Sequence, residues 1–198
     1  DLAWSRGLGD VYKRQDPTSR RRVFLVAIRP DCIVDGKDAT DFFTVERTSS
    51  DDEVTVASCL DSEPEEGLQV PSEDVTWLDE RDATGYDGPR LVGTIGIGGM
   101  GWSVYDENGP AVTQKTWGQG PGGATALYRD SDWRVRRLSP WEALRTHSFP
   151  EEVSEWLKHT SEIEDDDRDG TAYRLCGNSI PVLTLRDVIE HIVTNIIK

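Results

Sequence analysis

One uninterrupted apolar run constrains the fold of this chain more than any other feature of the sequence. Residues 23–28 read Val-Phe-Leu-Val-Ala-Ile, with Arg22 before the run and Arg29-Pro30 after it. A short run that is rich in β-branched residues and lacks polar residues at alternate positions is typical of a strand buried on both faces, as in a parallel sheet. We therefore predict that residues 22–29 form an inner strand of an α/β domain.

The middle of the chain predicts a different kind of structure. Residues 38–87 are polar and acidic with only short apolar pieces, and residues 93–128 are rich in glycine between short strand-like pieces such as Trp102–Tyr105. Glycine at this density is typical of turns and tight loops. We expect residues 38–135 to form an irregular β-rich insert.

Helical signals return after Arg136. Ser139 and Glu142 have the spacing of a capping box, with Pro140 at the first helical position. The helical pattern then continues as far as Arg145. A first helix is therefore predicted directly after Ser139.

Two further helices are predicted towards the end of the chain. A short one is expected to start at Pro150, and the charged stretch 162–170 that follows is expected to be a solvated loop. The last helix is predicted after Pro181, because apolar residues recur there at helical spacing: Val182, Leu185, Ile189, Ile192, Val193 and Ile196.

The first fifteen residues lack the sequence patterns of secondary structure that the rest of the chain has. Residues 5–15, SRGLGDVYKRQ, have the periodicity of neither a helix nor a strand. They are the translation, without a mismatch, of a DNA string that resembles the adapter and transposon end of a common sequencing-library chemistry. We therefore expect residues 1–15 to be an adapter artefact that is not native, and the native sequence to begin near Asp16, inside a longer gene.

Charge and cysteine usage narrow the classes of function. The chain has 37 acidic against 22 basic residues, a net charge of −15, so any DNA binding must come from a local basic strip. The acidity itself suits solubility or adaptation to a saline habitat. Cys32, Cys59 and Cys176 have no metal-ligand spacing, so no metal site is expected. The sequence contains no apolar run long enough to span a bilayer, which argues against an integral membrane protein. We therefore expect a soluble, intracellular chain with no membrane partner.

Three separated motifs carry a resemblance to a known family. Residues 17–24 (PTSRRRVF) resemble the eighth motif of the cytosine-5 DNA methyltransferases, residues 136–150 (RRLSPWEALRTHSFP) the ninth, and residues 173–182 (YRLCGNSIPV) the tenth. Residues 99–123, between the eighth and ninth, look like the core of that family's target recognition domain. Each motif alone is weak, but their order around a glycine-rich insert is typical of the family.

The resemblance implies a fold and an activity. The fold is the C-terminal part of a Rossmann-like methyltransferase domain with an irregular β-rich recognition insert. Its implied parts are residues 16–37 (last catalytic strand), 38–135 (target recognition domain) and 136–198 (catalytic-domain C-terminal helices). The implied activity is transfer of a methyl group from S-adenosylmethionine to a flipped cytosine in double-stranded DNA. The implied setting is the cytoplasm of a prokaryote or a viral host, in restriction-modification, with a full-length enzyme that is monomeric.

The resemblance also assigns catalytic roles to two arginines. Negative charge grows on the cytosine ring during the reaction, and a guanidinium aimed at the ring carbonyl stabilises that charge. Arg22 takes this role, and Arg20 supports the site or contacts a phosphate. The alternative is that both are exposed arginines that precede a strand.

The remaining candidate residues fall into two groups. For DNA binding, Met100 fills the gap left by the flipped base, Ser103 lies in the same recognition segment, and Thr113 contacts a phosphate. For cofactor binding, Asn178 and Ser179 open the last helix, whose N-terminus suits the cofactor carboxylate. Two alternatives remain open, namely that Met100 is core filler and that Asn178 and Ser179 form a plain N-cap.

Several parts of the family pattern are not found in this sequence. The glycine-rich cofactor loop, the Pro-Cys nucleophile and the Glu-Asn-Val triplet all precede the eighth motif in the family. Cys32 follows the predicted strand, in the wrong order for the nucleophile, and Cys176 belongs to the tenth motif. We therefore expect this C-terminal fragment to be inactive alone. The alternative is a natural non-catalytic DNA-recognition subunit of a split methyltransferase.

Overall fold

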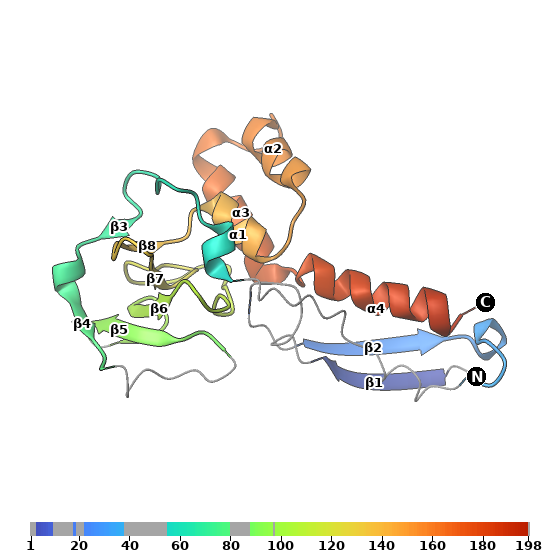
Figure 1. The fold of residues 1–198 in the computed structure, drawn as a ribbon. Coiled ribbons are helices and arrows are strands. Elements are labelled where there is room, and N and C mark those ends of the chain that lie inside the picture. Colours follow the sequence, from blue (N-terminus) through green and yellow to red (C-terminus); the bar gives the residue numbers. More distant parts are fainter. Residues whose placement is uncertain are drawn as a thin grey trace.

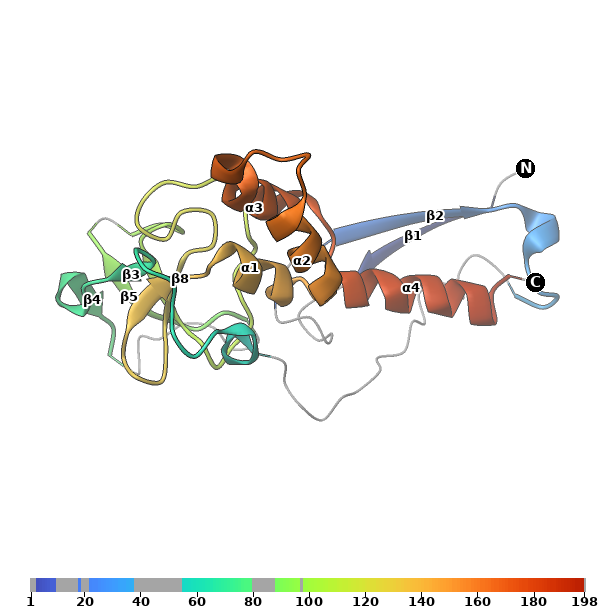
Figure 2. The ribbon, with the colours of Figure 1, turned by 90° about the horizontal axis from the view of Figure 1, so that it is seen from above.

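The chain folds into a β-rich lobe, a group of short helices beside it, and an extension formed by a strand pair and one long helix (Figures 1 and 2). The computed structural model describes residues 3–9, 18, 22–37, 55–79, 88–96 and 98–197. Within these residues, no helix combines the length and the apolarity that a membrane span requires.

The β-rich lobe is a six-stranded sheet built from the middle of the chain, between Gln69 and Arg137. Its strand order is β3-β8-β7-β6-β5-β4, and every neighbouring pair is antiparallel except β6 and β7. The strand β8 crosses the boundary predicted at residue 136, so the sheet extends slightly further than the predicted insert. The strands are β3 (Gln69–Val70), β4 (Val75–Trp77), β5 (Leu91–Ile95), β6 (Ser103–Asp106), β7 (Leu127–Arg129) and β8 (Val135–Arg137).

Three helices follow the sheet: α1 (Pro140–Thr146), α2 (Glu151–His159) and α3 (Arg168–Asn178). The predicted capping box is confirmed at α1, where Ser139 Oγ accepts from Glu142 N and the Glu142 carboxylate accepts from Ser139 N. The helices and the sheet share one hydrophobic core, to which Tyr128 of β7, Leu144 of α1 and Cys176 of α3 belong. The helices are therefore packed onto the six-stranded sheet.

The expectation of a loop at residues 162–170 is wrong in its second half. Residues Asp165–Asp167 form a 3-10 turn, and α3 begins at Arg168. Acidic residues are favourable at a helix N-terminus because they compensate the helix dipole. Arg168 also donates to the carbonyl oxygens of Lys158 and Thr160 at the end of α2, which ties the two helices together.

The predicted strand at residues 22–29 forms β2 (Arg22–Ile28), but its expected environment is wrong. It pairs antiparallel with β1 (Ala3–Gly9) in a two-stranded sheet, not within a parallel sheet. Val26 and Ile28 are half-buried and Ala27 is exposed. Burial on both faces requires covering layers on both sides, and the described residues do not supply them. Whether residues 1–15 are native stays a prediction that this pairing does not test.

The predicted last helix is confirmed as α4 (Val182–Asn195). It extends from the lobe in the same direction as the β1–β2 pair (Figures 1 and 2), and its far end is joined to the segment after β2, where Val34 N donates to Ile196 O. Part of its apolar face is uncovered, because Leu185, Ile189 and Val193 are 38%, 50% and 56% exposed.

Candidate functional site

Three segments that are distant in sequence meet around one cavity of about 620 Å³. They are the loop before β6, the segment between residues 114 and 123, and the end of α3. The residues that line the cavity are Met100, Gly101, Trp102, Gln114, Lys115, Thr116, Trp117, Gly118, Gln119, Gly123, Gly177 and Asn178.

Glycines allow these segments to touch through their backbones. A Cβ placed on Gly101 would lie 1.7 Å from the carbonyl oxygen of Gln119, and one placed on Gly177 would lie 2.3 Å from the backbone nitrogen of Thr116. Backbone atoms cannot move aside as a flexible side chain can, so only glycine fits at either position. Gly177 therefore fixes α3 directly against the β-rich lobe.

We expect Gly177→Ala to destabilise the protein although it lies in a helix. In a solvent-exposed helix, alanine is more stable than glycine by about 1 kcal/mol. At Gly177 the contact with Thr116 reverses that sign. The matched control is Gly170→Ala in the same helix, where the new Cβ would meet only the side-chain ends of Asp167 and Arg174 at 3.2 and 3.4 Å.

Urea denaturation of the two variants measures this difference. Gly170→Ala should raise the unfolding midpoint or leave it unchanged, and Gly177→Ala should lower it. A rise for both variants would show that α3 does not touch residue 116.

The loop before β6 contains Met100, a predicted DNA-binding residue, and is held by hydrogen bonds from Ser103, another one. The carbonyl oxygen of Gly99 accepts from Trp102 N and Ser103 N, and also from Ser103 Oγ at 3.0 Å. Ser103 is 7% exposed, so its hydroxyl holds the loop and does not face outward. Met100 is half-buried and lines the cavity, and Thr113 is exposed just before the cavity wall begins. The structure thus brings Met100 and Thr113 to the surface around the cavity and withdraws Ser103 from it.

The expectation that Asn178 and Ser179 open the last helix is wrong. Asn178 is the final residue of α3, and Ser179 caps that helix at its C-terminus, with Ser179 N donating to Leu175 O. The next helix begins only after Pro181, whose fixed φ suits the start of a new helix. Asn178 nevertheless lines the same cavity as Met100, so a predicted cofactor residue and a predicted recognition residue share one site.

Of the two predicted catalytic arginines, the structure describes only the backbone of one. Arg20 lies outside the described residues, and Arg22 is described only as the backbone residue that begins β2. Thr18, in the same motif, is 1% exposed and forms a parallel bridge with Ala111. The start of the predicted eighth motif therefore contacts the chain two residues before Thr113.

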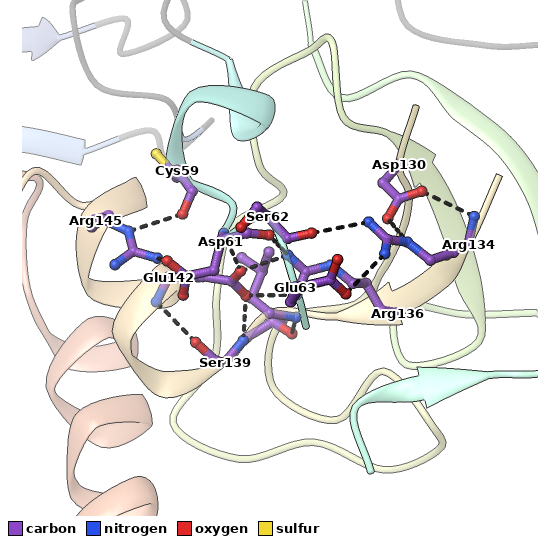
Figure 3. Close-up of polar contacts among 12 residues, drawn as sticks. Cys59, Asp61, Ser62, Glu63, Asp130, Arg134, Arg136, Ser139, Glu142 and Arg145 are labelled. Atoms are coloured by element: carbon purple, nitrogen blue, oxygen red, sulfur yellow. Dashed lines mark hydrogen bonds and ion pairs between the residues drawn. The ribbon is translucent and has the colours of Figure 1, made fainter. Parts of the chain in front are cut away.

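A buried ion pair joins α1 to β8, and the same carboxylate holds the segment around Asp61 that leads into the six-stranded sheet (Figure 3). Arg136 and Glu142 have side chains that are 1% and 0% exposed, and they make two hydrogen bonds of 2.5 and 3.2 Å. The Glu142 carboxylate also accepts from Ser139 N at 2.7 Å and from Asp61 N at 2.8 Å. Four donors therefore satisfy one buried carboxylate, as a buried charge requires.

Arg145 extends this connection from the next turn of α1. Its Nε donates to Cys59 O at 2.9 Å, and its Nη2 lies 2.7 Å from the Asp61 carboxylate. The sequence pattern assigned only the capping box to Glu142. The pairing with Arg136, on a strand six residues earlier, follows from the tertiary fold and has no helical spacing that would indicate it.

The two buried cysteines are unsuited to nucleophilic chemistry. Burial raises the pKa of the Cys59 thiol to about 11 and the pKa of the Cys176 thiol to about 12. The thiolate is the nucleophile, and at neutral pH these groups are thiols. Neither side chain therefore provides the attacking sulfur of the predicted reaction.

The architecture is a group of helices packed onto a six-stranded sheet, with one cavity where the two meet, and comparison with known proteins identifies the family. The family model described as C-5 cytosine-specific DNA methylase matches residues 14–194. The chain therefore belongs to the C-5 cytosine-specific DNA methylase family. No curated protein matches the chain at the significance required.

Solved structures show the same fold at low sequence identity. The Entamoeba histolytica methyltransferase EhMeth has a TM-score of 0.60 and 14% identity, covering 96% of this chain and 53% of that one. The Dnmt2 methyltransferase of S. pombe has a TM-score of 0.62 and 14% identity, with coverages of 97% and 57%. A DNMT2 variant from Spodoptera frugiperda has a TM-score of 0.53 and 13% identity, with coverages of 96% and 58%. The α/β fold prediction is confirmed, and the chain spans little more than half the length of these structures.

Proposed function

We propose that this chain is the target-recognition part and C-terminal end of a DNA cytosine-5 methyltransferase that acts on double-stranded DNA. The observation that carries the proposal is the cavity shared by Met100 and Asn178, in a chain whose family match extends over residues 14–194. The proposed recognition loop and tenth motif both line it, which suits transfer of a methyl group from a bound donor to a DNA base. The methyl donor that we propose is S-adenosylmethionine.

The proposed roles follow from the chemistry of cytosine. Carbon 5 is a poor nucleophile and lies inside the base stack, so the base has to leave the duplex and be activated by addition of a thiolate at carbon 6. On this proposal Arg22 stabilises the charge on the ring, with Arg20 beside it. Met100 occupies the space that the flipped base leaves, and Thr113 contacts the DNA backbone.

Of the two residues proposed to bind the cofactor, Asn178 and Ser179, only the first has a side chain positioned to contact it. Asn178 is exposed and lines the cavity, so its carboxamide is positioned to meet polar groups of a bound molecule. Ser179 donates its hydroxyl to Cys176 O at 3.2 Å and retains only its acceptor lone pairs. We therefore propose Asn178 as the contact to S-adenosylmethionine, which supplies an electrophilic methyl group when bound, and Ser179 as the residue that fixes the end of α3.

The remainder of the proposal concerns the whole protein. We propose a monomeric enzyme of a prokaryotic or viral restriction-modification system, working in the cytoplasm, with the catalytic cysteine and the main cofactor loop on residues that precede this part of the domain. The coverage of only 53–58% of the related structures also suits a second candidate, a non-catalytic recognition subunit that completes a split enzyme. The gene sequence upstream of Asp16, read in one unbroken stretch, separates the two.

The chemical product tests the proposal. The enzyme completed with the residues encoded upstream should release tritium from duplex DNA labelled at cytosine carbon 5, and the release should depend on S-adenosylmethionine. The methylated DNA should contain 5-methylcytosine. Methylation of adenine or of the cytosine amino group, or transfer to an RNA duplex and not to DNA, would contradict it.

A further inference from the structure

The cavity differs in charge from the rest of this acidic chain. The protein has a net charge of −15, yet no described residue that lines the cavity is acidic, and Lys115 contributes one positive charge. A second cavity, at the start of α3, is lined by Glu162, Glu164, Asp166 and Asp167. The first cavity is therefore a place where an acidic protein can accept an anionic partner without like-charge repulsion.

Among the described residues, Lys115 differs from most cations in having no acidic partner. Within the part of the chain that the structure describes, it makes no ion pair, whereas Arg129, Arg134 and Arg145 are each paired with an aspartate. Its backbone is fixed, because Lys115 N donates to Ala124 O at 3.1 Å. A cation at a cavity wall to which no described carboxylate is paired suits a phosphate group.

Trp117 stands at the same wall with most of its indole in solvent. It is 71% exposed, more than any other large apolar side chain in the described residues. The backbone that follows it is pinned, since a Cβ on Gly118 would lie 1.9 Å from the carbonyl oxygen of Gly123. The pinned loop therefore presents an aromatic side chain that the described residues leave mostly exposed, and such a face stacks on nucleic acid bases.

We propose that Trp117 stacks on a DNA base that has left the base stack, and that Lys115 contacts the adjoining phosphate. This inference rests on the proposed function, and it adds two DNA-contact residues to Met100 and Thr113. It places the DNA at the part of the cavity that Lys115 and Trp117 line, and Asn178 lines the same cavity. Stacking on an indole is tolerant of base identity, so Trp117 holds an unstacked base without selecting its sequence.

The test uses the full 198-residue chain and two DNA probes, an intact duplex and the same duplex with one bulged, unpaired base. Trp117→Ala should weaken binding to the bulged duplex about tenfold, and by less for the intact duplex, because only the first offers a free base face. Trp117→Phe should retain most of the affinity. The matched control is Trp156→Ala, which removes an indole that is 53% exposed on α2 and should leave binding unchanged.

The phosphate contact has its own readout. Lys115→Gln should reduce the slope of log binding constant against log salt concentration by about one, since one phosphate contact is lost. Lys37→Gln removes another exposed lysine and should leave the slope unchanged. Circular dichroism of each variant should match that of the parent chain, because neither Trp117 nor Lys115 is in the core.

The outcomes separate this inference from the proposed function. Equal affinities for Trp117→Ala and Trp156→Ala, with normal DNA binding, would overturn the inference and leave the proposed function standing. Tighter, Trp117-dependent binding of an RNA hairpin would overturn DNA as the occupant. Displacement of the DNA by added S-adenosylmethionine would make Trp117 part of a cofactor site. Absence of binding to either duplex would overturn both the inference and the DNA substrate.

Discussion

Glu142→Gln should lower the free energy of unfolding by about 3–5 kcal/mol, which is the usual effect of removing one partner from a buried ion pair. Arg136 would remain 1% exposed with its positive charge, and the neutral carboxamide would turn its NH₂ group toward one of the four donors that the carboxylate now satisfies. The loss would reach beyond α1, because the same carboxylate holds the backbone of Asp61. Urea denaturation followed by tryptophan fluorescence and circular dichroism measures the effect.

The matched control for this prediction is Glu155→Gln. Glu155 is 52% exposed and lies 2.8 Å from Lys158 on the surface of α2. Exposed ion pairs contribute little to stability, so the unfolding midpoint should hardly change. A double variant, Arg136→Met with Glu142→Leu, should recover part of the loss, because no unpaired charge is left buried. Similar small effects for Glu142→Gln and Glu155→Gln would show that the pair does not stabilise the fold.

Local signals in the sequence predicted local structure well. The Ser139 capping box depends on residues three apart, and the apolar spacing after Pro181 depends on one helix alone, so neither prediction needed the rest of the fold. The helix α3 (Arg168–Asn178) was not predicted, for the opposite reason. A Gly-Asn-Ser triplet is typical of a turn, so the residues before it gave no helical signal. The helix nevertheless continues through Gly177, because that glycine packs against the backbone of Thr116.

Tertiary contacts also decided which candidate side chains face outward. Ser103 has a residue type suited to DNA contact, yet its hydroxyl is bound to Gly99 O at 3.0 Å within its own loop. Trp117 was not selected from the sequence as a candidate, because an exposed tryptophan cannot be told from a core tryptophan by its neighbours in the chain. Its 71% exposure is known only from the fold.

The burial of β2 (Arg22–Ile28) could not be judged from its own residues. An apolar run shows that a strand suits a buried position, but the covering layers come from elsewhere. On the proposed function, β2 and the uncovered residues Leu185, Ile189 and Val193 of α4 face the rest of the catalytic domain. Such a contact accounts for a strand with the apolar sequence of a buried strand in which Val26 and Ile28 are only half-buried and Ala27 is exposed.

The second large effect is expected in catalysis. This chain alone should transfer no methyl group, because covalent activation of cytosine requires a thiolate. Burial raises the pKa of Cys59 to about 11 and that of Cys176 to about 12, which keeps both as thiols. Cys32 follows β2 in a position that the family pattern does not use. In an enzyme completed with the upstream residues, Cys32→Ser should therefore leave the rate unchanged, and Arg22→Ala should lower it by a factor of about 100 or more, as loss of one charge-stabilising donor does.

Methyl transfer measured in three mixtures tests the central claim most directly. The mixtures contain the 198-residue chain, the upstream half of the domain, or both, each with duplex DNA and radiolabelled S-adenosylmethionine. We predict labelled 5-methylcytosine only in the third mixture, because recognition and chemistry are then present together. Donor-dependent methylation by this chain alone, particularly if Cys32→Ser abolished it, would contradict the claim that the chain recognises the target and the upstream residues carry the reaction.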